Sequence, residues 1–380
     1  MRICYVADGA SIHTQRWLNY FAQKGHEVHL ICWKVMPGYD DSIHIHLLTR
    51  LAPKIWAASQ YLSFLFWIIQ VRRLIRRIKP DIVDGHFITV YGFLAACSGF
   101  HPLVLTAWGS DILITPKQNP IYRFLTKYSL RKADLVVCRT PFMREEIAKL
   151  DVHPKKLKIS FLGVNTKEFS PAQRSEELRE KLDIYSLLPV VISTRALRPI
   201  YDIQTLVKAI PLVLKDVQQA KFAIVGEGEQ LKYLETLAHS LAILDSIRFV
   251  GHIPYEKVSH YLASSDIYVS TSLSDGAPSS LLEAMACGLA PVVTDIAANR
   301  AWIQDGENGF LVPVRDPEML AAKITFLLRN DDIRSRFGEI NMKIVKEKAE
   351  YNVQLEKLEE IYVGLLWDVR KRQDSVKSRL

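Results

Sequence analysis

Short hydrophobic runs alternate along this chain with longer segments in which apolar residues recur at helical spacing. The first run, Arg2–Ala7, ends at the turn-forming pair Asp8-Gly9 and predicts a buried strand. Thr14–Gln23 then predicts a helix, which Gly25 ends. In the rest of the first half, the pattern predicts strands at Glu27–Trp33, Asp81–Val83, Leu103–Thr106 and Asp134–Cys138, and a long helix at Ile55–Ile78. Such alternation is typical of a parallel sheet covered by helices on both faces.

The same alternation restarts after Gly163, at a turn-rich linker predicted for Leu162–Pro171. Strands are predicted at Val190–Thr194, Phe222–Val225, Ile247–Val250, Ile267–Ser270 and Pro291–Thr294, and helices at Ile203–Leu214 and Tyr351–Val369. We therefore expect an α/β protein with two Rossmann-like, doubly wound domains, residues 1–162 and 163–360, and a C-terminal helix of about residues 361–380 that packs back on the first. Open sheets of this kind bind ligands beyond the carboxyl ends of their strands, so a deep cleft between the domains is the expected site.

Composition excludes several other classes of protein. Hydrophobic residues make up 49% of the chain and charged residues 24%, as in an ordinary globular protein. The five cysteines lie far apart, so neither a disulfide framework nor a zinc site is expected. The chain opens on a predicted strand instead of a secretory signal, and its longest apolar stretch, Tyr61–Val71, is shorter than the ~20 residues of a spanning helix. We expect a cytoplasmic protein.

The net charge of +8 is unevenly distributed. Residues 1–165 carry 22 Lys or Arg against 11 Asp or Glu, whereas residues 166–380 carry 27 against 30. A basic first half indicates an anionic partner, such as anionic lipid, a phosphate-bearing acceptor or nucleic acid, unless it is only a solubilising surface.

The predicted helix that ends at Lys79 has an apolar face and a basic end, and two interpretations of it stay open. It is a core helix with a solvated end, or it contacts an anionic membrane peripherally. The residues predicted for its apolar face are Ile55, Leu62, Leu65, Phe66 and Ile69, and those of its basic end are Arg72, Arg73, Arg76, Arg77 and Lys79.

The segment with the strongest chemical signal surrounds Glu283. A turn containing Gly276 leads to Pro278, which suits the first turn of a helix, and Gly288 ends that helix. Glu283 lies in its most apolar part, where a carboxylate is costly unless hydrogen-bond donors satisfy it. It is predicted either to bind a ligand or to pair with a buried Arg or Lys. The helix start offers free backbone N–H groups, which suit phosphate or sugar oxygens.

Asp275 precedes Glu283 by eight positions, and Glu283 begins the sequence Glu-Ala-Met-Ala-Cys-Gly. This segment resembles the signature of glycosyltransferase family 4, whose members have the GT-B fold and carry Glu-x7-Glu; here aspartate replaces the first glutamate. The resemblance covers nearly the whole chain and is firmest between Val190 and Val314. It implies a retaining enzyme that moves a hexose-type sugar from a nucleoside-diphosphate sugar to a hydroxyl acceptor, such as a lipid-linked or cell-envelope glycan in polysaccharide biosynthesis.

The resemblance also implies roles for individual residues of the donor site. Glu283 accepts hydrogen bonds from ribose hydroxyls, whereas Asp275 and the backbone from Gly276 to Pro278 hold the transferred sugar. Arg195 grips the diphosphate, because a guanidinium pairs bidentately with phosphate. Arg198 either replaces a family lysine, whose position holds Tyr201, or is a solvated loop residue. The other donor-side candidates are Gly9, Gly226, Gly228, Gly251, His252, Ile253, Ala277, Ser279 and Leu282.

The first domain resembles the family more loosely and supplies the acceptor-side candidates. These are His13, His86, Trp108 and Asp111. His13 is otherwise an ordinary loop histidine, and Trp108 stands where the family commonly has histidine. Asp111 is either an acceptor contact or a helix cap.

The resemblance implies a metal-independent mechanism without an enzymic nucleophile. No Asp-x-Asp motif appears, so neither a metal nor another cofactor is expected. Arg195 and the helix start near Pro278 then stabilise the leaving diphosphate, and a phosphate oxygen takes the acceptor proton. The alternatives are an inactive or partner-dependent family member, a GT-B-fold sugar-nucleotide epimerase, a phosphorylase, or a module that binds nucleic acid or an anionic surface. Nucleic acid is not expected, because no motif for it appears.

Overall fold

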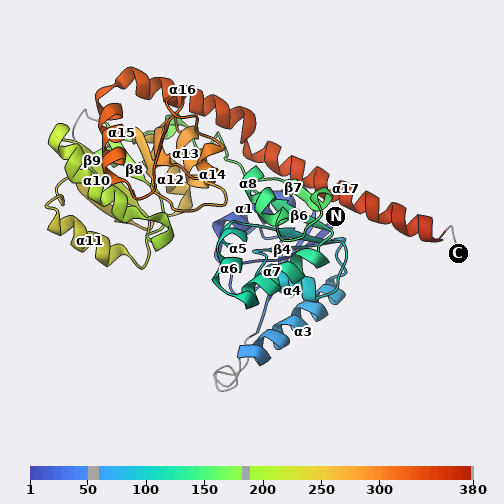
Figure 1. Ribbon diagram of the computed structural model, residues 1–380. Helices are drawn as coiled ribbons and strands as arrows, with labels where there is room; N and C mark the ends of the chain where they lie inside the picture. Colours follow the sequence, from blue (N-terminus) through green and yellow to red (C-terminus); the bar gives the residue numbers. More distant parts are fainter. Residues whose placement is uncertain (50–59, 182–188, 378–380) are drawn as a thin grey trace. The chain divides into compact units, whose positions relative to one another are not determined.

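The chain forms two compact units (Figure 1). The computed structural model describes residues 1–49, 60–181 and 189–377. The first unit comprises Met1–Leu162 together with Gln354–Leu380, and the second comprises Gly163–Val353. The segment that returns to the first unit thus begins at Gln354, earlier than the sequence pattern indicated. Each unit is built around one parallel sheet.

The first unit contains a seven-stranded sheet in the order β3-β2-β1-β4-β5-β6-β7, in which every pairing is parallel. The strands are β1 (Arg2–Val6), β2 (Glu27–Cys32), β3 (His44–Leu47), β4 (Ile82–His86), β5 (Leu103–Thr106), β6 (Leu135–Cys138) and β7 (Leu157–Ile159). The strand order reverses between β1 and β4, and such a switch point is where doubly wound sheets bind ligands.

Helices cover the first sheet. They are α1 (Ile12–Gln23), α3 (Gln60–Ile78), α4 (Tyr91–Cys97), α5 (Ser110–Leu113), α6 (Thr115–Gln118), α7 (Pro120–Lys132), α8 (Pro141–Ala148) and the greater part of α17 (Tyr351–Lys377). Local sequence determines where α7 and α8 begin. The side chains of Asn119 and Thr140 accept hydrogen bonds from backbone N–H groups of the first turn, and a proline follows each of them.

Helix α3 packs on its unit chiefly through residues outside the apolar face that the sequence analysis described. Its buried side chains are Trp67, Val71, Ile75 and Ile78. Of the predicted apolar face, Leu65 and Ile69 are exposed and Phe66 is half-buried. The first half of this helix is apolar nearly all round, so periodicity alone does not select the buried side. Ile55 lies outside the described residues, as does the side chain of Leu62.

The second unit contains a six-stranded parallel sheet in the order β10-β9-β8-β11-β12-β13. Its strands are β8 (Val190–Ser193), β9 (Lys221–Val225), β10 (Ile247–Gly251), β11 (Ile267–Ser270), β12 (Ala290–Thr294) and β13 (Phe310–Val312). Numbered within the unit, this is the order 3-2-1-4-5-6 of nucleotide-binding doubly wound domains. The switch point lies between β8 and β11.

The helices of the second unit complete the alternation. They are α9 (Glu176–Lys181), α10 (Ile203–Asp216), α11 (Leu231–Ser240), α12 (Tyr255–Ala263), α13 (Ser279–Ala286), α14 (Ala297–Arg300), α15 (Pro317–Arg329) and α16 (Asp331–Lys348). Gly288 follows α13 with a φ of +80°, which confirms the predicted glycine stop. No helix within the described ranges is long and apolar enough to cross a membrane.

Candidate active site

The loops after β8 and β11 are joined at the switch point of the second unit. The hydroxyl of Thr271 donates to the carbonyl oxygen of Tyr201 at 3.0 Å, and the N–H of Leu273 donates to that of Ile200 at 2.8 Å. The loop after β12 joins them, because the Thr294 hydroxyl donates to the carbonyl oxygen of Ser272 at 2.6 Å. These bonds hold the segments that precede α10 and α13 in one arrangement at the carboxyl edge of the sheet.

Arg195 follows the end of β8 and is bonded to residues on both sides of the start of α13. Its Nη2 lies 2.7 Å from the carboxylate of Asp275, and its Nη1 donates to the Ser280 hydroxyl at 2.8 Å. The Tyr201 ring centroid lies 4.1 Å from the guanidinium carbon. Burial by itself lowers the pKa of Arg195, but Asp275 outweighs it and the pKa lies above its ordinary value. The Nε atom has no hydrogen-bond partner among the described residues.

Asp275 is therefore held in place by the protein itself. One carboxylate oxygen accepts from Arg195, and the other accepts from the backbone N–H of Ala277 at 3.2 Å. The Ser280 hydroxyl that receives Arg195 also accepts from the buried Tyr268 hydroxyl at 2.8 Å. The sequence did not single out Ser280 or Tyr268. The only signal for Ser280 was its position at the predicted helix start, and Tyr268 lies within the strand predicted at Ile267–Ser270.

Glu283 is 5% exposed within α13. The Tyr255 hydroxyl, at the start of α12, donates to its Oε1 at 2.9 Å. This hydrogen bond from a neutral donor offsets part of the free-energy cost of burying a carboxylate. The sequence did not identify Tyr255, although it lies two positions after the donor-side candidate Ile253.

Two of the predicted donor-side glycines have a structural explanation. Gly226 has a φ of +142°, and a side chain on it would collide with the carbonyl oxygen of Arg195. A side chain on Gly228 would collide with that of Leu197. Both glycines thus let the loop after β9 approach the loop after β8. The N–H of Gly226 also donates to the carbonyl oxygen of Gly251 at 2.9 Å, so the loop after β10 joins the same edge.

The remaining donor-side candidates of the second unit differ in exposure. Arg198 and His252 are exposed, whereas Ile253, Ala277 and Ser279 are half-buried. The exposure of Arg198 favours a solvated loop arginine. Gly276, Pro278 and Leu282 are buried around the start of α13.

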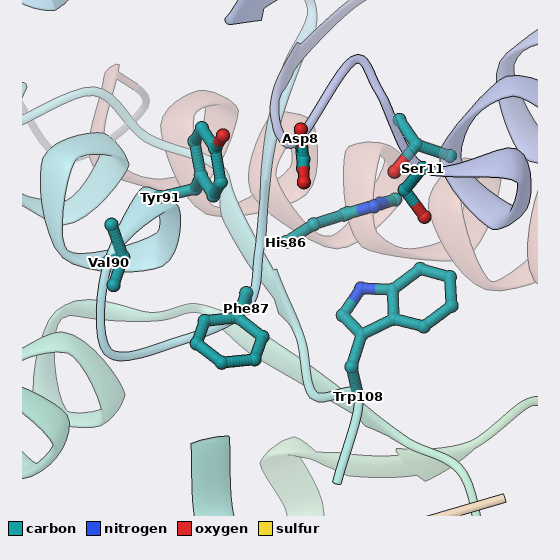
Figure 2. Close-up of a pocket in the computed structure, with 8 residues that line it drawn as sticks. Asp8, Ser11, His86, Phe87, Val90, Tyr91 and Trp108 are labelled. Carbon is teal, nitrogen blue, oxygen red and sulfur yellow. The ribbon is translucent and has the colours of Figure 1, made fainter. Parts of the chain in front are cut away.

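In the first unit, a cavity of about 320 Å³ opens beside the switch point of the sheet (Figure 2). It is lined by Asp8, Ser11, Thr14, His86, Phe87, Val90, Tyr91 and Trp108. These residues come from the carboxyl ends of β1, β4 and β5 and from the helices that follow them. Gly9 follows Asp8 in the chain, and a side chain on it would collide with the carbonyl oxygen of Lys34 in the segment after β2.

The structure brings three of the four acceptor-side candidates together. The rings of His13 and Trp108 are stacked with centroids 5.5 Å apart, and the centroids of His86 and Trp108 are 5.4 Å apart. Asp111 has a different environment. It is fully buried, and its carboxylate accepts from the backbone N–H groups of Ile88, Trp108 and Gly109. These bonds favour the helix-cap interpretation of Asp111 over an acceptor contact.

Arg139 completes this cluster, although the sequence analysis missed it. It directly follows β6, is 4% exposed, and has its guanidinium carbon 3.8 Å from the Trp108 ring centroid. Burial lowers the pKa of Arg139 to about 9, against the raising effect of Asp111 and Asp84, so it stays cationic at neutral pH. Its Nε and Nη2 have no hydrogen-bond partner within the described part of the chain. The available signal in the sequence was an arginine immediately after the strand predicted at Asp134–Cys138.

Helix α17 contacts the strand β4, which carries the cavity residue His86. Asp84 is fully buried on β4 and accepts hydrogen bonds from the hydroxyls of Thr106 and Tyr362. His86 Nε2 lies 3.5 Å from an Asp84 oxygen. Tyr362 thus connects the returning helix to the strand that carries His86.

Two family models match the chain, one over each unit. Residues 2–140 match "Glycosyl transferase 4-like", and residues 174–343 match "Glycosyl transferases group 1". Together they span most of the chain. The protein belongs to this family of glycosyltransferases and has the GT-B fold, as the resemblance implied.

Curated relatives are similar over different lengths. An uncharacterized glycosyltransferase of Methanocaldococcus jannaschii is 28% identical over 63% of this chain, and the aligned part covers 61% of that protein. The N-acetyl-alpha-D-glucosaminyl L-malate synthase of Bacillus anthracis is 24% identical over 91% of both chains. An Escherichia coli UDP-Gal:alpha-D-GlcNAc-diphosphoundecaprenol alpha-1,3-galactosyltransferase is 23% identical over 90% of this chain and 89% of that protein.

Solved structures share the fold. The sucrose-phosphate synthase of Thermosynechococcus elongatus superimposes with a TM-score of 0.82 and 18% identity over 97% of this chain and 100% of the other. HepE of Anabaena, in complex with UDP and glucose, superimposes with a TM-score of 0.80 and 17% identity over 95% and 99%.

Proposed function

We propose that this protein is a retaining, metal-independent glycosyltransferase that moves a hexose-type sugar from a nucleoside-diphosphate sugar to a hydroxyl acceptor. The observation that carries the proposal is the Arg195–Asp275–Ser280 cluster beside Glu283, at the switch point of a sheet with nucleotide-binding strand order. The second unit is the donor-binding domain and the first is the acceptor-binding domain.

Each polar group of the cluster has a task in binding the donor. The carboxylate of Glu283 accepts from the ribose hydroxyls, and that of Asp275 from hydroxyls of the transferred sugar. Arg195 orients Asp275 through Nη2, holds Ser280 through Nη1 and offers its unpaired Nε to the diphosphate. A guanidinium held in place before the reaction stabilises the charge that develops on the leaving group without reorganisation. The N-terminus of α13 adds to that field.

The transfer step conserves atoms and charge. The bond from the sugar anomeric carbon to the diphosphate oxygen breaks, and the acceptor oxygen bonds to that carbon on the same face. The proton of the acceptor hydroxyl moves to a phosphate oxygen of the leaving group. An axial donor therefore gives an axial product.

The acceptor carries an anionic group near its reactive hydroxyl. Support comes from Arg139, which lies over the Trp108 ring and whose buried Nε and Nη2 lack hydrogen-bond partners among the described residues. The names of two relatives agree with this chemistry, since diphosphoundecaprenol and L-malate are both anionic. A lipid-linked or cell-envelope glycan acceptor, in polysaccharide biosynthesis, fits this requirement.

The acceptor-binding domain acts peripherally at the cytoplasmic face of an anionic membrane. Helices α3, α4 and α7 pack side by side on this unit (Figure 1). On α7, Ile121 and Phe124 are 62% and 66% exposed and lie beside the exposed Arg123. Leu65 and Ile69 of α3 are also exposed. Exposed apolar side chains next to basic ones suit the headgroup region of anionic lipid.

The test uses Glu283→Gln, which keeps the volume of the side chain but removes its charge. Thermal shifts are measured with UDP, GDP, ADP and their hexose derivatives. We expect the nucleotides of one of these three bases to bind. At a hundredfold excess over Kd, such a ligand raises the free energy of unfolding of the wild type by about 2.7 kcal/mol. Glu283→Gln is expected to bind that ligand roughly tenfold more weakly, since hydrogen bonds to a charged group contribute about 1.5–3 kcal/mol.

The exposed Glu235 of α11 provides the matched control, and Glu235→Gln is expected to bind like the wild type. If the wild type, Glu283→Gln and Glu235→Gln bound the nucleotide with equal affinity, the assignment of Glu283 to the donor site would be wrong. NMR of the glycoside formed with α-linked donor tests the stereochemistry separately, and a β-linked product would exclude retention.

A further inference from the structure

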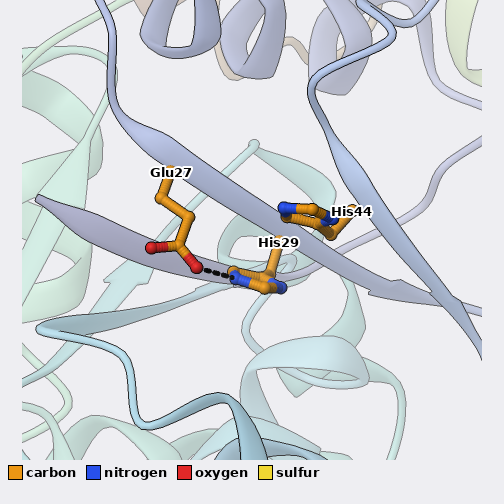
Figure 3. A group of neighbouring side chains, drawn as sticks. All are labelled: Glu27, His29 and His44. Atoms are coloured by element: carbon orange, nitrogen blue, oxygen red, sulfur yellow. Dashed lines mark hydrogen bonds and ion pairs between the residues drawn. The ribbon is translucent and has the colours of Figure 1, made fainter.

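A cluster of ligating side chains lies at the opposite end of the first sheet from the proposed acceptor site (Figure 3). Glu27 and His29 are two residues apart on β2, and His44 and His46 are two residues apart on β3. This spacing puts both members of each pair on one face of the sheet. The parallel register aligns His29 with His44, so the two pairs are neighbours. Glu27 and His44 are the first residues of their strands.

The distances suit a metal ion. One ligand atom each from Glu27, His29 and His44 lie within 4.8 Å of one another. His29 Nε2 is 3.1 Å from Glu27 Oε1, and the stacked rings of His29 and His44 have centroids 4.7 Å apart. Ligands about 2.0–2.1 Å from a tetrahedral zinc ion lie roughly 3.3 Å from each other. Glu27 and His29 already have this separation, and the exposed His44 reaches it by side-chain rotation.

A fourth residue orients the central histidine. His29 is 8% exposed, and its Nδ1 lies 3.0 Å from His46 Nε2. Metal-binding histidines almost always donate their second N–H to a neighbouring acceptor, which determines the tautomer and the ring orientation. With a metal on His29 Nε2, the Nδ1–H donates to His46. The buried ligand is thus pre-oriented, while the two exposed ligands are able to adjust.

The nearby positive charge does not prevent binding. Arg2 Nε lies 2.8 Å from Glu27 Oε1, and both side chains are substantially exposed. Exposed pairs of this kind contribute about 0–1 kcal/mol, and a carboxylate has a second oxygen that is able to receive the guanidinium.

We propose that Glu27, His29 and His44 bind one divalent transition-metal ion, most favourably Zn²⁺, with water in the remaining position. Imidazole ligands select Zn²⁺ over Mg²⁺ and Ca²⁺, which take oxygen ligands. In the described part of the chain, no other group of three such side chains has this geometry. The ion links the edge strand β3 to β2 and takes no part in sugar transfer, so the proposal is independent of the metal-free mechanism.

The test is equilibrium dialysis of the EDTA-treated full chain against Zn²⁺, with Co²⁺ absorption spectra as a report on the ligands. We expect one Zn²⁺ per chain and visible Co²⁺ bands of a low-symmetry site with nitrogen ligands. His44→Ala and Glu27→Gln are expected to lower the affinity for Zn²⁺ at least tenfold. His46→Ala, which removes the orienting acceptor, is expected to lower it about 10–100-fold.

His239→Ala, at an exposed histidine of α11 in the other unit, is the matched control and is expected to bind Zn²⁺ like the wild type. Thermal unfolding of the metal-free variants tests for misfolding. His44→Ala is expected to melt with the metal-free wild type, because His44 is exposed. No saturable Zn²⁺ binding by the wild type, or the same affinity in His44→Ala and His239→Ala, would overturn the proposal.

Discussion

Two buried arginines lie just beyond a strand end, one in each unit, and have different partners. Arg195 follows β8 and Arg139 follows β6, and each guanidinium stacks on an aromatic ring, Tyr201 or Trp108. Arg195 is neutralised by Asp275 at 2.7 Å. Arg139 has two nitrogens without hydrogen bonds to any described residue. A buried cation without a bonded partner is costly, which is why we assign Arg139 to an anion supplied by the substrate.

At the residue scale, Arg139→Gln is expected to raise KM for an anionic acceptor roughly tenfold to a hundredfold. The reason is the loss of charge-assisted hydrogen bonds of about 1.5–3 kcal/mol. KM for the donor is expected to stay near the wild-type value. Steady-state assays with L-malate and with a diphosphoundecaprenyl-linked sugar measure both constants.

The conservative Arg139→Lys keeps the charge and is expected to recover part of the acceptor affinity. Thermal unfolding of Arg139→Gln checks that its fold is intact, because removing an unpaired buried charge is not expected to destabilise it. An unchanged acceptor KM in a folded Arg139→Gln protein would contradict the assignment.

At the scale of elements, all the central strands were predicted from the sequence, whereas of the edge strands only β10 was. The predicted strand at Leu103–Thr106 is observed as β5 with those limits, because three consecutive apolar residues followed by a β-branched threonine are typical of a strand buried on both faces. The short edge strands β3, β7 and β13 escaped prediction. β3, for example, has the sequence His-Ile-His-Leu and is mostly exposed, so neighbouring strands decide its conformation more than its own pattern does.

The exposed apolar residues of α7 give the prediction at this scale. The double variant Ile121→Glu, Phe124→Glu is expected to bind phosphatidylglycerol vesicles more weakly, by about tenfold for each substituted side chain. Burial of each apolar side chain in the headgroup region contributes about 1.5 kcal/mol to the free energy of binding, which corresponds to about a tenfold change in affinity. Sedimentation with anionic and neutral vesicles measures the effect. Leu244→Glu, at an exposed apolar residue of the second unit, is expected to leave binding unchanged. Equal binding of the wild type to both kinds of vesicle would exclude the anionic-surface proposal.

At the scale of the whole molecule, the first unit is built from both ends of the chain. Helix α17 returns to it from Gln354 onward, and Tyr362 is stacked on Phe21 with centroids 5.5 Å apart. The Tyr362 hydroxyl donates to the buried Asp84 beside the proposed acceptor site. The C-terminal segment from Gln354 onward is therefore an integral part of the first unit.

Tyr362→Phe tests this arrangement. It leaves a buried carboxylate with one hydroxyl donor fewer and is expected to destabilise the first unit by about 1–3 kcal/mol. Urea unfolding followed by hydrogen exchange distinguishes the two units, and amides of the second sheet are expected to keep their protection. Tyr233→Phe, at an exposed tyrosine that bonds to Gln204, is expected to change stability little. Loss of protection spread equally over both sheets would contradict the expectation.

The sequence by itself determined the alternation of strands and helices, the turns that separate them and the Asp275–Glu283 signature, because each depends on neighbours within one element. Only the tertiary structure decided which side chains meet. Arg195 pairs with Asp275 across 80 positions, and Tyr362 with Asp84 across 278. Such contacts depend on strand order and on the return of the last helix. Local sequence patterns indicate neither the strand order nor the return of the last helix. Ser280, Tyr255 and Arg139 are therefore recognised as candidate site residues only in the folded structure.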